Sequence, residues 1–162
     1  MLESQHRVKS IALVHEKLYQ SEDLAKINFS DYLHSLVASL FDSYKTGSNH
    51  ITKTIQVDNI ELDIDTAIPC GLIVNELISN ALKYAFPDDR DGEVRLDFHV
   101  QESNQLILSV KDTGVGIPEH IDLQTTRSLG LKLVRGFAAQ LEGSVEITCS
   151  QGTLISITFP QH

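Results

Sequence analysis

The sequence predicts an α+β fold, a two-layer α/β sandwich in which helices cover one face of a mixed, mainly antiparallel sheet, with an N-terminal helical appendage. Three observations predict this fold. Residues 69–86 form a long helical pattern, residues 94–110 and 145–159 each form two alternating apolar segments around a turn, and a second helical pattern lies between these hairpins. With 162 residues, the chain is long enough for one main domain and a small appendage.

The charge of the chain argues against nucleic acid as a partner. Thirteen Lys and Arg residues against twenty-two Asp and Glu residues give a formal charge of -9, and no basic cluster interrupts the acidic balance. The two cysteines, the absence of a signal-like segment and the absence of any run near the ~20 apolar residues of a membrane span predict a cytoplasmic location without membrane contact by this segment.

The N-terminal part shows two helical patterns. Apolar residues recur at helical spacing from Val8 to Tyr19, which predicts one helix through the first twenty residues. Ser30 is the expected cap of a second helix, whose apolar stripe starts at Leu33 and which is expected to close near Gly47. Neither stripe carries an obvious arrangement of reactive side chains.

Extended segments are expected to lead into the central helix. Asp65 and Thr66 suit the start of that helix, with Pro69 in its first turn. Before them, apolar residues alternate with polar ones: Ile55, Val57, Ile60, Leu62 and Ile64.

The central helix carries polar side chains along one side. A helix advances about 100° per residue, so Glu76, Asn80 and Lys83 share a side with Tyr84. Taken alone, such a stripe most often meets water, so its meaning depends on the rest of the chain. The opposite side is expected to pack, because it is apolar: Leu77, Ile78, Ala81, Leu82 and Ala85.

Three glycine-bearing segments follow the central helix. They are DTGVGIP at residues 112–118, SLGLKLV at residues 128–134, and Gly152-Thr153 between two alternating stretches. A single DxGxG is a common turn and weak evidence. Residues 119–127 are mainly polar and without a repeat, which predicts a short mobile lid between two of the glycine segments.

The ordered set of segments resembles the N, G1, G2 and G3 boxes of the ATPase and kinase superfamily that contains gyrase, MutL and the histidine kinases. This resemblance spans about half of the chain and implies a Bergerat-type ATP-binding fold. Upstream, SIALVHEKLYQSEDLAKINFSDYL resembles the end of the dimerisation hairpin in sensor histidine kinases of the HisKA_2 and HWE-related group. The implied division is residues 1–24 as the end of that hairpin and residues 25–162 as the catalytic ATP-binding domain.

The resemblance implies ATP and Mg²⁺ as ligands and gives roles to the polar residues. Asp112 would accept a hydrogen bond from the adenine amino group, and Asn80 would hold Mg²⁺ together with the phosphates. Lys83 would neutralise phosphate charge, and Glu76 would orient water, help the metal or polarise an incoming imidazole. The other expected ATP contacts are Tyr84, Gly114, Gly116, Ile117, Leu129, Gly130, Leu131 and Thr153.

The function implied is transfer of the ATP γ-phosphate to a histidine on a helix outside this chain, and then to an aspartate of a response regulator receiver domain. A homodimer through the hairpin is a further implied partner. His6 lacks the asparagines of the acceptor motif and His15 lies on the apolar stripe, so neither is expected to be phosphorylated. The alternatives are an anti-sigma-type serine kinase, against which HEKLYQSEDL argues, and a non-catalytic nucleotide-binding adaptor or pseudokinase, against which Asn80, Asp112 and the glycine segments argue.

Overall fold

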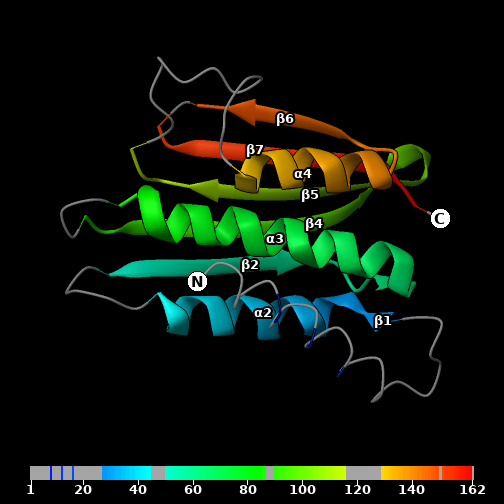
Figure 1. The fold of residues 1–162 in the computed structure, drawn as a ribbon, viewed down its shortest axis with the longest axis horizontal. Coiled ribbons are helices and arrows are strands. Elements are labelled where there is room, and N and C mark those ends of the chain that lie inside the picture. Colours follow the sequence, from blue (N-terminus) through cyan, green and yellow to red (C-terminus); the bar gives the residue numbers. More distant parts are fainter. Residues whose placement is uncertain are drawn as a thin grey trace.

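The computed structural model of the chain describes residues 8, 12, 16, 27–44, 50–86, 90–115, 129–149 and 151–161. In this part of the chain, the main sheet has the strand order β2-β4-β5-β7-β6, and the helices α2, α3 and α4 lie together on one of its faces (Figure 1). Strand β2 pairs with β4 in parallel, and the other neighbours are antiparallel. The predicted sandwich of helices on a mixed, mainly antiparallel sheet is therefore confirmed.

The elements follow one another in an order that brings α3 back across the sheet between two parallel strands. A two-stranded ladder of β1 and β3 lies apart from the main sheet. The bounds are β1 Ile27–Asn28, α2 Phe29–Ser43, β2 Ile51–Val57, β3 Glu61–Leu62, α3 Ile64–Tyr84, β4 Gly92–Gln101, the 3-10 turn η1 Glu102–Asn104, β5 Gln105–Asp112, α4 Leu129–Gln140, β6 Ser144–Thr148 and β7 Thr153–Pro160.

The core lies between the helices and one face of the sheet. Alternate residues of the strands point into it, among them Phe98 of β4 and Phe159 of β7, both fully buried. The ring of Phe29 from α2 meets Phe98 edge to face with centroids 5.5 Å apart. Both predicted hairpins, β4–β5 and β6–β7, are present. Two residues of the alternating apolar pattern are nevertheless exposed, Val100 at 49% and Cys149.

The predicted helix starts are wrong by a few residues. Asn28, not Ser30, caps α2, because its side chain accepts a hydrogen bond from Asp31 N at 3.3 Å. Helix α3 begins at Ile64, since Asp63 caps it by accepting from Thr66 N at 2.9 Å. Ile64 is thus helical and not extended. Pro69 lies in the second turn and not in the first, and it is buried.

Of the helix predicted through the first twenty residues, the structure describes only residues 8, 12 and 16. Val8, Ala12 and Glu16 are helical and exposed, with Val8 at 66%. His6, His15 and the predicted lid at 119–127 lie outside the described residues. Among the helices that are described, none has the length and apolar character needed to cross a bilayer.

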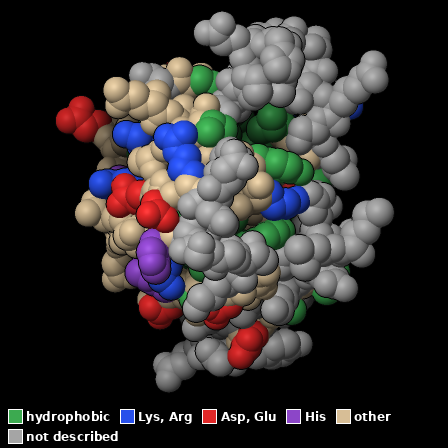
Figure 2. All heavy atoms as spheres, turned by 90° about the vertical axis from the view of Figure 1, so that its left-hand side faces the viewer, with side chains coloured by type: hydrophobic (Ala, Val, Ile, Leu, Met, Phe, Trp, Pro, Cys, Tyr) green, Lys and Arg blue, Asp and Glu red, His purple; other side chains and the backbone are tan. Residues whose placement is uncertain are grey.

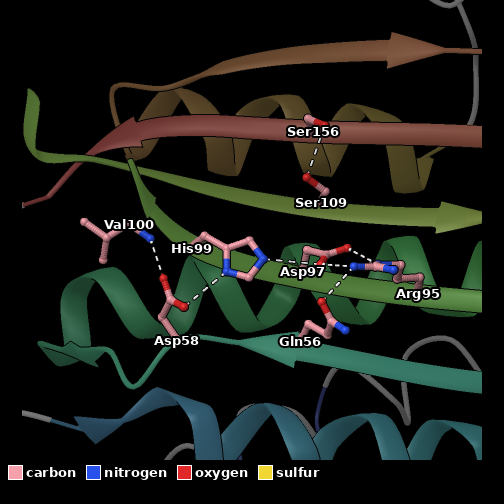
Figure 3. Close-up of polar contacts among 8 residues, drawn as sticks. All are labelled: Gln56, Asp58, Arg95, Asp97, His99, Val100, Ser109 and Ser156. Carbon is pink, nitrogen blue, oxygen red and sulfur yellow. Dashed lines mark hydrogen bonds and ion pairs between the residues drawn. The ribbon is translucent and has the colours of Figure 1, made fainter. Parts of the chain in front are cut away.

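The face of the sheet opposite the helices carries a row of charged side chains (Figure 3). His99 Nδ1 lies 3.3 Å from Asp58 Oδ1, and His99 Nε2 lies 3.3 Å from Asp97 Oδ1. Arg95 Nε donates to Asp97 Oδ2 at 2.8 Å. Partial burial lowers the pKa of His99, but its hydrogen bonds to Asp58 and Asp97 outweigh this, so the pKa is raised.

We expect the His99 row to make the free energy of unfolding depend on pH. Because the folded protein binds the His99 proton more tightly, this contribution is complete below the unfolded pKa of about 6.5 and is lost as pH rises through the folded value. The stability difference between the wild type and His99→Gln, measured by urea unfolding, should therefore shrink from pH 6 to about pH 8. The matched control is His34→Gln at an exposed site of α2. A difference that stays constant with pH would contradict the expectation.

Candidate functional site

The predicted site residues come from four elements that meet at one end of the sheet, where β5 ends. Helix α3 delivers Asn80 near its C-terminus, β5 delivers Asp112 at its last position, α4 delivers Gly130 in its first turn, and β7 delivers Thr153 at its first position. This end of the sheet is on the left of Figure 1. Figure 2 views it directly and shows basic, acidic and hydrophobic side chains close to one another.

The first turn of α4 lies directly against the polar side chains of α3. A Cβ added at Gly130 would stand 2.8 Å from Glu76 Oε2 and 3.3 Å from Asn80 Nδ2. The first N–H groups of a helix have no partners within that helix and carry partial positive charge. The Glu76 carboxylate is therefore favourably placed beneath α4, and an anion near this turn would meet the same positive end.

Burial decreases along the polar side of α3. Glu76 is only 4% exposed, Asn80 and Lys83 are half-buried, and Tyr84 is 66% exposed. The interpretation of the stripe as a solvent-facing surface is wrong at Glu76, because α4 covers this part of the helix. Lys83 Nζ lies 5.5 Å from the centroid of the Tyr84 ring, within cation–π range.

Asp112 is a buried carboxylate with backbone donors. It is 7% exposed, its Oδ1 accepts from Gly114 N at 2.9 Å, and it stands opposite Thr153 in the β5–β7 ladder. Burial raises its pKa, and the hydrogen bonds from the backbone of Gly114 and Thr153 partly offset this by favouring the charged form. The site thus presents a fixed acceptor for a ligand N–H group.

Gly114 packs against the end of α3. A Cβ there would overlap the Ala85 carbonyl oxygen, and Val115 N donates to that same oxygen at 2.9 Å. The sequence interpretation gave Gly114 as an expected ATP contact, and it missed this packing because Ala85 carries no polar signal. The contact ties the Asp112 segment to the helix that bears Asn80.

The remaining predicted residues are only partly described. Gly116 and Ile117 lie outside the described residues, and Leu129 is the first residue of α4. Leu131 packs against the core. Ser79, which the sequence interpretation did not include, has a buried Oγ without a hydrogen-bond partner in the described part of the chain. In that same part, no group of three or more His, Cys, Asp or Glu side chains could hold a metal ion.

Comparison with known proteins gives the family of this fold. The model of the histidine kinase-, DNA gyrase B- and HSP90-like ATPases matches residues 65–162. A second family model, HisKA_2, described as histidine kinase, matches residues 1–44. The chain belongs to this ATPase family and, within it, to the histidine kinases.

The similar proteins agree with this family. Blue-light-activated histidine kinase 2 of Erythrobacter litoralis is 31% identical over 163 residues, which cover 95% of this chain and 45% of that protein. Sensor histidine kinase PdtaS of Mycobacterium tuberculosis is 30% identical over 151 residues, covering 90% of this chain and 29% of that protein. The chain thus spans less than half the length of these relatives.

A solved structure shows how closely the fold is shared. The histidine kinase domain of the Erythrobacter litoralis EL346 blue-light activated histidine kinase superposes with a TM-score of 0.90 at 29% identity. The match covers 98% of this chain and 75% of the other.

Proposed function

We propose that this chain is the ATP-binding catalytic part of a sensor histidine kinase, with residues 1–24 as the end of the dimerisation hairpin and residues 25–162 as the catalytic domain. The observation that carries the proposal is the close approach of Gly130 to two side chains of α3. A Cβ added at Gly130 would stand 2.8 Å from Glu76 Oε2 and 3.3 Å from Asn80 Nδ2. The N-terminus of α4, which favours anions, lies next to the Asn80 amide, which can hold Mg²⁺, and these two features would suit phosphates, with Glu76 buried beneath α4. The family match over residues 1–44 favours this function over a serine kinase.

The buried Asp112 is the proposed reader of the base. Its Oδ1 is held by Gly114 N at 2.9 Å, so its orientation is fixed before a nucleotide arrives. An adenine amino group donates to a carboxylate, whereas guanine has an oxygen at the same place and would leave this acceptor unpaired. Thr153, opposite Asp112 in the ladder, is the proposed second contact to the base.

The half-buried Asn80 and Lys83 are the proposed phosphate end of the site. Asn80 offers an amide oxygen, a hard ligand that suits Mg²⁺ when phosphates and waters complete the coordination. Mg²⁺ bound there would neutralise charge on the phosphates of ATP. Lys83 lies one turn further along α3 and adds a positive charge, while exposed Tyr84 beside it is free to cover the base or ribose. Gly116, Ile117, Leu129, Gly130 and Leu131 complete the proposed ATP contacts.

The buried Glu76 fits a supporting role best. Its carboxylate lies under the first turn of α4 and is only 4% exposed, so it is placed to hold that turn against Asn80. Direct contact with an incoming imidazole would require α4 to move away from it.

The proposed reaction is attack by a histidine nitrogen on the γ-phosphorus of ATP, with ADP as the leaving group. The chain's residues contribute by positioning and charge neutralisation. The proposed acceptor is a histidine on a hairpin helix outside this chain. The next proposed acceptor of the phosphoryl group is an aspartate of a response regulator receiver domain. We expect two copies to form a homodimer through the hairpin. The proposed location is the cytoplasm.

A labelling experiment tests the proposal. The chain with Mg²⁺ and γ-labelled ATP should bind nucleotide without becoming a phosphohistidine protein, because His6 and His15 are not the acceptor. Adding a fragment with the upstream acceptor helix should give acid-labile label on that fragment's histidine, and γ-labelled GTP should not. Label on a serine of a partner would indicate the serine kinase, and label on His6 or His15 would show that the acceptor lies in this chain.

A further inference from the structure

Thr113 ends strand β5 in an unusual way. Opposite residues of an antiparallel ladder alternate between pairs that exchange two backbone hydrogen bonds and pairs that exchange none, and in the first kind each N–H donates to the carbonyl of the other residue. Thr113 N does donate to Glu93 O at 3.1 Å, but Glu93 N donates to the Thr113 side chain, at 2.9 Å from Oγ1. The hydroxyl therefore takes the place of the Thr113 carbonyl in the ladder.

The Thr113 carbonyl has a partner outside the β4–β5 ladder. It accepts from Arg90 Nη2 at 3.4 Å. The chain then leaves the sheet at Thr113, and the next two residues run to the end of α3, where Val115 N donates to Ala85 O at 2.9 Å. The side chain of Thr113 thus sets the point at which β5 stops and the Asp112 segment bends.

Close packing around Thr113 leaves little room for another path. A Cβ at Gly92 would stand 2.7 Å from Thr113 Oγ1, and one at Gly152 would stand 3.1 Å from Thr113 Cα. A Cβ at Gly114 would overlap the carbonyl oxygen of Ala85. The backbone at Gly92 and Gly152 can approach Thr113, and that at Gly114 can approach Ala85, this closely only because these positions have no side chain.

We propose that Thr113 is a positioning residue for base recognition, and that its hydroxyl group orients the Asp112 carboxylate through the backbone of Gly114. By accepting the Glu93 N–H, it directs Gly114 N onto the Asp112 carboxylate, a contact of 2.9 Å. The inference rests on the proposed function, because it assigns Thr113 to the same site. It adds a determinant of nucleotide selectivity that contacts no part of the nucleotide.

Calorimetric titration with Mg·ADP and Mg·GDP tests this role. Thr113→Val should raise the Kd for ADP about tenfold and narrow the preference for ADP over GDP, because the Asp112 carboxylate loses its fixed orientation. Thr113→Ser, which restores the hydroxyl, should bind ADP within about twofold of the wild type. The matched control is Thr54→Val, since Thr54 Oγ1 also bonds to Glu93, at 2.6 Å from its Oε2, but does not contact the Asp112 segment.

The outcomes separate this inference from the proposed function. If the wild type does not bind ADP, both the proposed function and the inference about Thr113 are wrong. Wild-type ADP affinity in a folded Thr113→Val chain, or equal weakening by valine and serine, would overturn the inference alone. If the valine variant does not fold, Thr113→Ala removes the hydroxyl without added bulk and gives the same readout. An alanine variant that also fails to fold would overturn the inference, because the hydroxyl would then belong to the fold and not to selectivity.

Discussion

Asp112→Asn should bind ATP about 100-fold more weakly than the wild type while keeping its fold. The asparagine Oδ1 can still accept from Gly114 N, a bond of 2.9 Å in the wild type, so this contact with the local backbone is retained. The second oxygen becomes an NH₂ group, which would face the adenine amino group as donor against donor. Calorimetry gives the affinity, and circular dichroism with thermal unfolding reports the fold.

The matched control for this change is Asp97→Asn. Asp97 is also a strand carboxylate, but it belongs to the charged row on the opposite face of the sheet. It should leave the affinity for ATP unchanged. Unchanged ATP affinity in Asp112→Asn, or a loss of equal size in Asp97→Asn, would show that Asp112 does not read the base.

Gly152→Ala should lower the free energy of unfolding by about 3 kcal/mol and the thermal midpoint by about 10 °C. Gly152 has φ +110°, a conformation that other residues rarely adopt. Its added Cβ would also overlap the backbone carbonyl oxygen of Asp112 and stand 2.9 Å from Asp112 C. Backbone atoms cannot swing aside as the end of a flexible side chain can, so the strain stays. Urea unfolding measures the effect.

Gly136→Ala is the control, because it is the same substitution in open space. Gly136 lies on the exposed side of α4, and a Cβ there would meet nothing within 4 Å. Alanine is the better helix former, so the change should stabilise the protein by about 0.5–1 kcal/mol. Equal effects of the two substitutions would contradict the strain assigned to Gly152.

Most of the fold could be predicted because its elements have strong periodic patterns. The strict alternation in β4, β5 and β7 fixes which side chains enter the core, and both hairpins followed from it. The helix starts were missed because two residues with capping side chains lie close together. Asn28 and Asp63 cap their helices ahead of the expected Ser30 and Asp65, and only tertiary packing decides between such neighbours.

The sequence suggests which residues belong to the candidate site, but it does not show how they are arranged in space. The pattern of α3 shows which residues share a side, and the structure brings Gly130 against Glu76 and Asn80. Burial of Glu76 depends on α4, more than fifty positions later in the chain, which no local pattern contains. Contacts through carbonyl groups, such as Ala85 with Val115, are also invisible in a sequence, because every residue has a carbonyl.

The η1 turn, at Glu102–Asn104, offers a place where the chain can be lengthened. It is exposed and lies at the end of the sheet opposite Asp112 (Figure 1). The β4–β5 ladder has eight residue pairs, from Gln101 with Gln105 beside the turn to Val94 with Asp112, and they hold the register of both strands. An epitope or a single fluorophore inserted after Ser103 would disturb the local hydrogen bonds between Asn104 and Gln161, and the paired strands would not transmit that change to the end of the sheet that carries Asp112.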